Sequence, residues 1–318
     1  PLLFNLAGGD FVVVTRMDPV LTSTTQDSTK PCETGLQTSP VMTLPRDNTT
    51  AGPDLVEIGE LGVDFGRQMV LRNVDLRVPR GQTLAVIGES GCGKTVLLKT
   101  IIGLIRPSCG VVRIDGQELT RLSERQLTDL RARFGFVFQN AALFDSMTIG
   151  QNVAFPLRQH RRCKDSEIQL VVRDALAQVG LPEAVVYRYP AELSGGMRKR
   201  VGLARALVMD PELILYDEPT TALDPIMSDV INELILRTQR RAQVTSVVIT
   251  HDMNPARKVA DRVVMVYPVS RLEAGESQIL FDGSPGELDD CRDRRVQQFV
   301  RGEAGERLME MRAQKDEG

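Results

Sequence analysis

The residue types and spacing most suited to chemistry in this chain lie in residues 88–95, which read Gly-Glu-Ser-Gly-Cys-Gly-Lys-Thr. This run fits the pattern G-x-x-x-x-G-K-[ST], whose glycines let backbone N–H groups approach phosphates closely. In that pattern Lys94 neutralises phosphate charge and Thr95 offers a hydroxyl to Mg²⁺. By itself the pattern indicates only a nucleotide-binding protein. The predicted contacts are Gly88, Glu89, Ser90, Gly91, Cys92, Gly93, Lys94 and Thr95.

Two carboxylates follow an apolar run further along the chain. The run Leu213 to Tyr216 is typical of a buried strand, and Asp217 and Glu218 come directly after it. Asp217 could lie near Mg²⁺, and Glu218 could take a proton from an attacking water. An apolar run that ends in Asp-Glu is also common where the carboxylates only cap a helix or a strand. Its place downstream of a phosphate loop favours the functional interpretation.

A serine and two glycines stand before a predicted helix from about Met197 to Met209. Ser194 is a good N-cap residue, and Gly195 and Gly196 would leave backbone N–H groups open. The start of the helix is therefore a possible anion site. An ordinary capped helix would have the same sequence.

Alternating strands and helices are expected to position these residues. β-Branched apolar runs predict the strands, and apolar residues at helical spacing predict the helices. The expected strands are Leu55–Ile58, Val70–Val78, Thr83–Ile87, Leu213–Tyr216, Ser246–Thr250 and Arg262–Val266. The expected helices are Lys94–Ile105, Asp165–Gly180 and Met197–Met209. This alternation predicts an α/β fold with a mainly parallel sheet, and the chiefly helical stretch at about 141–208 predicts a helical subdomain.

Composition and charge exclude several classes of protein. The 318 residues carry a net charge of −3 with interspersed signs, unlike a nucleic-acid-binding surface. The five cysteines include no C-x-x-C pair, which argues against a zinc site or disulfide framework and suits a reducing cytoplasm. No run approaches the roughly 20 apolar residues that span a bilayer. We therefore expect no direct membrane span and no signal peptide.

The two ends differ from the centre. Residues 1–53 are expected to be a disordered arm, because Thr, Ser and Pro dominate from Leu21 to Pro53. The predicted nucleotide-binding domain covers residues 54–283, and residues 284–318 are expected to be a short charged tail.

The order of the three motifs resembles the ATP-binding subunits of ATP-binding-cassette (ABC) transporters, over about Leu55 to Gly283. The resemblance implies a P-loop NTPase core with a mainly parallel sheet, an antiparallel β subdomain and an inserted helical subdomain. It implies ATP hydrolysis with Mg²⁺ by two copies arranged head to tail. Each site would combine Lys94 and Thr95 of one copy with Ser194 and Gly196 of the other. Such a homodimer drives a separate membrane permease.

The resemblance also assigns roles to single residues. Gln139, after the apolar run Phe136–Phe138, matches the glutamine that senses Mg²⁺ and water, and His251 matches the switch histidine that contacts the γ-phosphate. Asp224 matches the loop that links the two sites. Phe65 matches the aromatic residue that stacks on adenine, although tyrosine is commoner there. These roles make Glu218, His251, Lys94 and Gln139 the expected catalytic residues, with Thr95, Gln139 and Asp217 at the metal.

Two residues of the phosphate loop region leave alternatives open. Cys92 is either a small filler or an oxidisable thiol beside a helix N-terminus. Val96 replaces the hydroxyl residue that often follows Lys-Thr, which would remove a contact to the α-phosphate. Val96 is similar to the residue in one branch of the family, and it is also counted among the expected nucleotide contacts.

That branch is the Mce-associated, Mla-type lipid transport ATPases. Residues 141–158, Lys94–Lys99 and Arg295–Gly302 are similar to it. The resemblance implies a multi-pass permease and an Mce-domain substrate-binding protein as partners, at the cytoplasmic face of a bacterial inner membrane. A small-solute importer ATPase would share every catalytic motif and remains the alternative. A non-transport ABC protein would usually carry two cassettes or a long coiled-coil insertion, neither of which occurs here.

Overall fold

A computed structural model describes most of the chain, which forms two compact units, Pro1–Thr50 and Ala51–Gly318. The described residues are 2–6, 10–14, 54–66, 68–160, 164–273 and 275–304.

The first unit contains one antiparallel pair of strands. β1 (Leu2–Leu6) pairs with β2 (Asp10–Val14) from Leu2 opposite Val14 to Leu6 opposite Asp10. Both segments lie in the predicted arm and are rich in apolar and β-branched residues, which favour strands. The Thr/Pro-rich remainder of the predicted arm lies outside the described residues.

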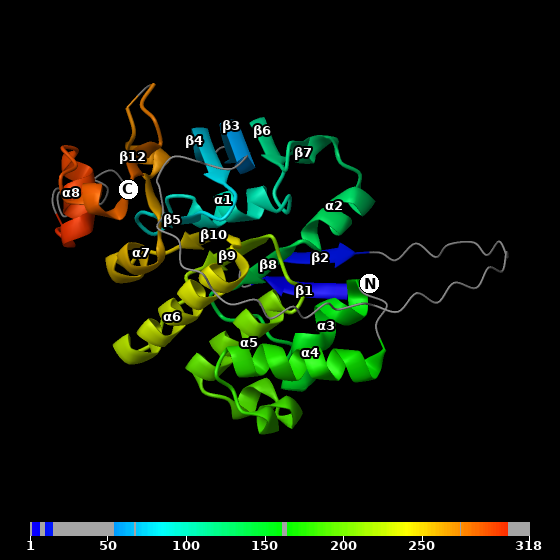
Figure 1. The fold of residues 1–318 in the computed structure, drawn as a ribbon. Helices are drawn as coiled ribbons and strands as arrows, with labels where there is room; N and C mark the ends of the chain where they lie inside the picture. Colours follow the sequence, from blue (N-terminus) through cyan, green and yellow to red (C-terminus); the bar gives the residue numbers. More distant parts are fainter. Residues whose placement is uncertain are drawn as a thin grey trace, which may run out of the picture. The chain divides into compact units, whose positions relative to one another are not determined.

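The second unit is built around a six-stranded sheet in the order β12-β11-β5-β10-β9-β8 (Figure 1). Only β12 at one edge is antiparallel to its neighbour. The strands are β5 (Thr83–Ile87), β8 (Phe134–Val137), β9 (Leu213–Asp217), β10 (Thr245–Ile249), β11 (Arg262–Val266) and β12 (Ile279–Gly283). Nearly all residues of the central strands β5, β9 and β10 are buried, as expected of a sheet covered on both faces.

An antiparallel sheet of order β4-β3-β6-β7 covers one face of this core. It comprises β3 (Asp54–Phe65), β4 (Gln68–Pro79), β6 (Cys109–Ile114) and β7 (Gln117–Glu118), with α1 (Lys94–Ile101) between the sheets and α2 (Glu124–Arg131) beside them (Figure 1). Helix α1 is shorter than the expected Lys94–Ile105. Gly103 adopts the left-handed conformation at φ 67°, which ends the helix.

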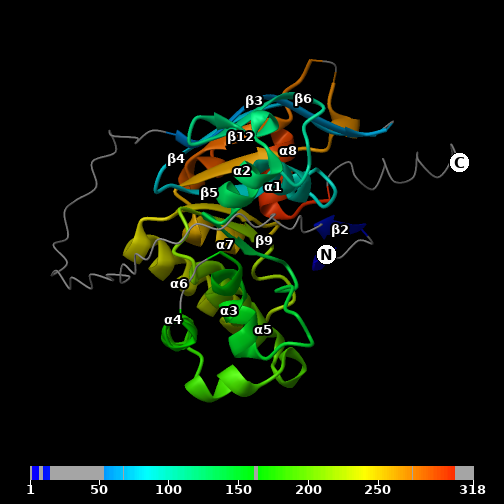
Figure 2. The same cartoon turned by 90° about the vertical axis from the view of Figure 1, so that its right-hand side faces the viewer.

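Helices cover the opposite face, and both views place α3–α5 together beyond that face (Figures 1 and 2). The helices are α3 (Ile149–His160), α4 (Asp165–Gln178), α5 (Gly195–Leu207), α6 (Pro225–Ala242) and α7 (Met253–Val259). The P-loop NTPase fold with antiparallel and helical additions is thus confirmed.

Each central strand serves both layers through alternate residues. In β10, Val247 and Ile249 pack in the cluster that contains α1 and the antiparallel sheet. Val248 lies between them in sequence and packs in the cluster formed with the helical layer. Because successive side chains of a strand point to opposite faces, the strand packs against both layers. This packing fixes the ends of the strands and the loops that follow them.

The segment expected to be a charged tail contains an ordered helix, α8 (Arg294–Arg301). Val296 is fully buried in a cluster with β5, β11 and α7, and Phe299 and Val300 pack against that cluster. The many charged residues of this segment led to the expectation of a charged tail, although Val296, Phe299 and Val300 form an apolar face. Among the described residues, no helix has the length and hydropathy needed to cross a membrane.

Candidate functional site

The predicted chemical residues converge because three parallel strands end at the same edge of the sheet. β5 leads into the phosphate loop, β9 leads into Glu218, and β10 leads into His251. β10 lies between the other two, with Ile249 opposite both Val86 and Asp217. The ends of the three strands therefore lie side by side, as expected for a binding edge in an α/β sheet.

Glycines let the phosphate loop pack tightly. Gly88 has φ 146°, and a Cβ there would lie 2.2 Å from the Val266 carbonyl oxygen. Gly93 has φ 102° as the N-cap of α1, and a Cβ would lie 2.8 Å from Leu71. A side chain at either position would push the loop away from the sheet. The loop ends at the N-terminus of α1, where open N–H groups and the helix dipole favour anions.

Lys94 bends back over the loop that precedes it. Its Nζ donates to the carbonyl oxygens of Gly88 at 2.8 Å and Glu89 at 2.9 Å. Lys94 is 7% exposed, so its charge lies in a confined space next to the anion-binding N–H groups. This position fits the predicted role in neutralising phosphate charge.

Cys92 is part of the same loop and is buried. Burial raises the pKa of its thiol, and this effect outweighs the opposing field of Lys94. The raised pKa keeps the thiol neutral. A neutral thiol is unreactive, because the thiolate is the reactive form. The geometry favours the filler interpretation over an oxidisable thiol.

Thr95 and Asp217 meet at the start of α1. The Thr95 hydroxyl donates to Oδ1 of Asp217 at 3.3 Å. Burial raises the pKa of Asp217 against the opposing hydrogen bond from Thr95. A hydroxyl and one carboxylate suit Mg²⁺, which usually takes few protein ligands and completes its shell with phosphates and water. These residues therefore fit the predicted metal site.

Glu218 is held in an unusual conformation beside them. It has φ 49°, a region that residues with side chains seldom adopt and that often marks functional sites. Its Oε2 lies 2.7 Å from Nδ1 of His251 and accepts a hydrogen bond from the Thr221 hydroxyl at 2.9 Å. The carboxylate is thereby oriented by two neighbours, as a general base should be. Sequence analysis missed Thr221.

The remaining predicted contacts lie on β3, after β8, in α1 and at the start of α6. Gln139 is exposed just after β8, the strand beside β9. Phe65 ends β3 and is 54% exposed, so its ring is accessible for stacking. Asp224 is the N-cap of α6, where its carboxylate accepts from Met227 N at 2.9 Å. Val96 lies in α1 and is half-buried against the core, with no hydroxyl to offer.

The Ser-Gly-Gly run begins α5 as expected. Ser194 caps the helix by accepting from Met197 N at 3.3 Å. Gly195 and Gly196 form the first turn, and a Cβ at Gly196 would lie 2.9 Å from the Met227 side chain. The helix thus starts at Gly195, two residues before the predicted Met197 boundary.

Gln278 is a residue that sequence analysis also missed. Its side chain is fully buried, and its Nε2 donates at 3.1 Å to the carbonyl oxygens of Cys92, Val70 and Tyr267. Its Oε1 accepts from Arg72 N at 2.8 Å. One amide therefore joins the phosphate loop to β4 and to the residue that follows β11. No local pattern around Gln278 signals this.

Arg271 supports the loop from the same side. Its guanidinium pairs with the Glu89 carboxylate and lies 4.9 Å from the centre of the Tyr267 ring. The guanidinium of Arg295, in α8, lies 5.1 Å from the same ring. The α8 helix is thus linked to the phosphate loop through stacked side chains.

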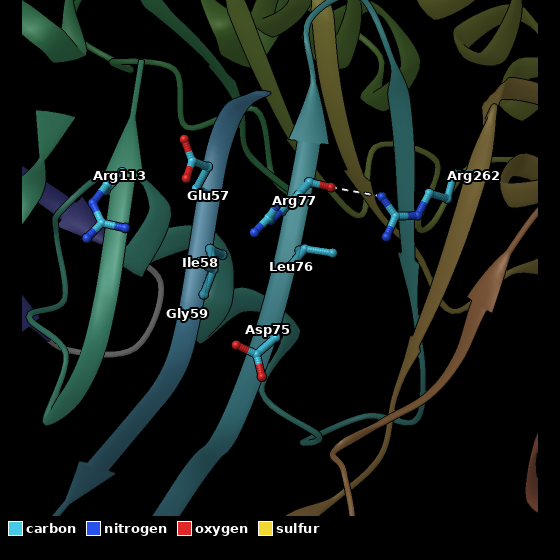
Figure 3. Close-up of a pocket in the computed structure, with 8 residues that line it drawn as sticks. All are labelled: Glu57, Ile58, Gly59, Asp75, Leu76, Arg77, Arg113 and Arg262. Carbon is cyan, nitrogen blue, oxygen red and sulfur yellow. Dashed lines mark hydrogen bonds between the residues drawn. The ribbon is translucent and has the colours of Figure 1, made fainter. Parts of the chain in front are cut away.

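A cavity of about 440 Å³ lies away from this site, beside the antiparallel sheet (Figure 3). Arg77, Glu57 and Arg113 stand in a row across β4, β3 and β6, and Arg262 donates to the Arg77 carbonyl oxygen at 2.9 Å. Charges of both signs line the cavity, so it shows no preference for an anion. We assign it no function.

Comparison with known proteins agrees with this geometry. A profile of the ABC transporter family matches residues 71–221. The phospholipid transport ATP-binding protein MlaF of Haemophilus influenzae is 38% identical over 251 residues, which are 79% of this chain and 92% of MlaF. The chain belongs to the ABC transporter ATPase family.

Other relatives in this family carry different names. The probable ribonucleotide transport ATP-binding protein mkl of Mycobacterium tuberculosis is 41% identical over 225 residues. That match covers 71% of this chain but only 62% of mkl. This ABC ATPase also superposes on the dimeric cassette MJ0796, solved in a post-hydrolysis state with ADP and Pi, at a TM-score of 0.64 and 32% identity. The superposition covers 72% of this chain and 98% of that cassette.

Proposed function

We propose that this chain is the ATP-binding and ATP-hydrolysing subunit of an ABC transporter and powers a separate membrane permease. The observation that carries the proposal is the Glu218 carboxylate, oriented by His251 and Thr221 next to the Thr95–Asp217 pair. A base, a metal-binding pair and a phosphate loop at one sheet edge are the parts that nucleotide hydrolysis requires.

The roles of the residues follow from their positions. Loop N–H groups and Lys94 bind the phosphates, and the Phe65 ring stacks on adenine. Thr95 and Asp217, with Gln139, would hold Mg²⁺, which neutralises phosphate charge when bound. Glu218 takes a proton from the attacking water, and His251 orients Glu218 and contacts the γ-phosphate.

A second copy of the chain would complete each site. Ser194, Gly195 and Gly196 leave N–H groups open at the start of α5, and a γ-phosphate on the opposite copy would lie against them. Asp224, beside the turn that carries Glu218, would lie at the same interface. The dimeric form of MJ0796 supports a homodimer.

We infer that the cargo is a lipid and that the partners are a multi-pass permease and an Mce-domain protein. The match to 92% of MlaF, named for intermembrane phospholipid transport, supports this. The ATPase would then bind peripherally at the cytoplasmic face of a bacterial inner membrane. A small-solute importer is the alternative, because the methionine import protein MetN 1 of Acinetobacter baylyi is 41% identical over 66% of this chain.

Phe144 lies in the segment expected to contact the permease. Its ring packs on Phe155 at 4.9 Å between centroids, and the loop around it is fixed by buried Asn152, which accepts from Phe144 N at 2.7 Å. Leu143 and Phe144 are half-buried, so part of each surface remains available for docking. This favours a preformed docking loop.

Purification from the native host with its associated membrane proteins would test the assignment. We expect co-purification of a permease and an Mce-domain protein, and ATP hydrolysis by the reconstituted complex that depends on phospholipid. Phe144→Glu should spare basal hydrolysis by the isolated subunit and abolish stimulation by the permease. Stimulation by a polar solute in place of lipid would favour the importer.

A further inference from the structure

Helix α5 carries a buried lysine whose ammonium group binds the turn that contains Glu218. Lys199 is 8% exposed, and its Nζ donates to the carbonyl oxygens of Thr221 at 2.6 Å, Pro219 at 3.0 Å and Glu218 at 3.4 Å. All three donors of the ammonium group are thus directed to one turn. A buried ammonium is costly unless its donors are satisfied, so this arrangement fixes the turn relative to α5.

A second cationic side chain of the same helix, that of Arg205, binds the turn that follows Gln139. The Arg205 guanidinium donates to the carbonyl oxygens of Ala141 and Ala142, each at 2.7 Å. These residues follow Gln139 by two and three positions. Gly202 lets the backbone of α5 approach this turn, because a Cβ there would lie 3.3 Å from the Ala141 side chain.

Both turns contain backbone that needs external support. Glu218 has φ 49°, Ala141 φ 60° and Ala142 φ 44°. Left-handed conformations of such residues persist only where the surroundings determine them. Lys199 and Arg205 supply that support from positions six residues apart on a single helix, α5, which Ser194 caps.

We propose that α5 positions both catalytic turns of its own cassette, with Lys199 fixing the turn that carries Glu218 and Arg205 fixing the turn that follows Gln139. The helix would thereby join the serine that faces one ATP to the base that acts on the other. This inference rests on the proposed roles of Glu218 and Gln139. Lys199 and Arg205 are positioning residues in this scheme and do not contact ATP.

The main test is Lys199→Met, which keeps the apolar stem and removes the donors. We expect kcat to fall about tenfold or more through misplacement of Glu218, while the Kd for ATP changes less than about threefold. Lys199→Arg, which keeps a cation with several donors, should recover much of kcat. Arg205→Met should lower kcat with the same small effect on Kd.

Arg200→Met is the matched control on the same helix. The Arg200 guanidinium also ends on backbone carbonyls, at 2.9 Å from Gly180 oxygen, but these belong to the loop after α4. We expect hydrolysis close to that of the wild type. A loss of kcat in Arg200→Met equal to that in Lys199→Met would indicate general disturbance of α5 and overturn the proposal.

A double-mutant cycle separates positioning from stability. If Lys199 acts through Glu218, adding Lys199→Met to Glu218→Gln should lower the residual single-turnover rate little further. Full additivity would overturn the proposal, as would wild-type kcat in Lys199→Met. Wild-type hydrolysis in Glu218→Gln alone would instead remove the proposed base. If Lys199→Met does not fold, Lys199→Gln, which keeps two donors, serves in the same cycle.

Discussion

The Nδ1 atom of His251 lies 2.7 Å from Oε2 of Glu218, and the Thr221 hydroxyl donates to the same oxygen at 2.9 Å. Two donors on Oε2 leave Oε1 with the greater capacity to accept a proton from water. His251 follows β10 and Glu218 follows β9, so the pairing of these strands sets the contact. The pairing of these strands thus orients the Glu218 carboxylate.

Replacing Glu218 by Gln should separate binding from hydrolysis. The amide keeps the size of the side chain but cannot take a proton, so kcat should fall by about 10²-fold or more while ATP binding persists. ATP should then trap a dimer, detectable by size-exclusion chromatography. The control Glu124→Gln changes an exposed residue of α2 and should hydrolyse normally. Turnover in Glu218→Gln near that of the wild type would contradict the assignment.

Removing the Gln278 amide should weaken the phosphate loop. Gln278→Met leaves the carbonyl oxygens of Cys92, Val70 and Tyr267 without this donor in a buried place. We expect the free energy of unfolding to fall by about 2 kcal/mol and ATP affinity to fall several-fold.

Gln297→Met is its control, because Gln297 donates to the Cys291 carbonyl oxygen away from the loop. Urea unfolding and nucleotide titration would measure both quantities. Equal loss of ATP affinity in the two variants would argue against a specific role for Gln278.

Lys199 predicts opposite pH trends for stability and hydrolysis. Burial lowers its pKa to about 8 from the ordinary 10.5, with the charge of Glu218 opposing the shift. Between these values the folded protein releases the proton while the unfolded chain keeps it, so the Lys199 contribution to the free energy of unfolding rises with pH. Below about pH 8 both states are protonated and the contribution is constant.

Hydrolysis should change in the other direction, because the neutral amine has fewer donors for the turn. The wild type should lose kcat above about pH 8, and Lys199→Arg should retain it to higher pH. Urea unfolding from about pH 7 to pH 10, with Lys199→Met as reference, measures how the free energy of unfolding changes with pH. An unfolding free-energy difference between the two proteins that is independent of pH would contradict the assignment.

A chain that begins at Ala51 should fold and hydrolyse ATP. The second unit starts there, and the core clusters contain no residue before Leu55 among the described residues. Thermal unfolding and kcat should therefore match those of the full chain, and limited proteolysis of the full chain should cut before about Pro53. Loss of folding on truncation would make the arm part of the domain.

The sequence alone determined the phosphate loop, the acidic strand end and the Ser-Gly-Gly helix start. Each of these depends on neighbouring residues, because the spacing of a few residues sets how backbone N–H groups and side chains meet a phosphate. The alternation of strands and helices likewise predicted the layered sheet and its buried strands. It shifted the ends of helices such as α1, and it specified no strand at β1, β2, β6, β7 or β12 and no helix at α2, α6, α7 or α8.

Tertiary structure alone decided how those motifs are held. Gln278 bonds to Cys92 across 186 positions of sequence, and Lys199 reaches the Glu218 turn across 19 to 22. No local pattern marks such residues, because a buried amide or ammonium resembles any polar residue until packing directs its donors. Burial of Cys92, which favours the filler interpretation, was decided in the same way. The chemistry of each motif depends on residues a few positions apart in the sequence. The residues that hold the motifs in place depend on which distant segments the sheet brings together.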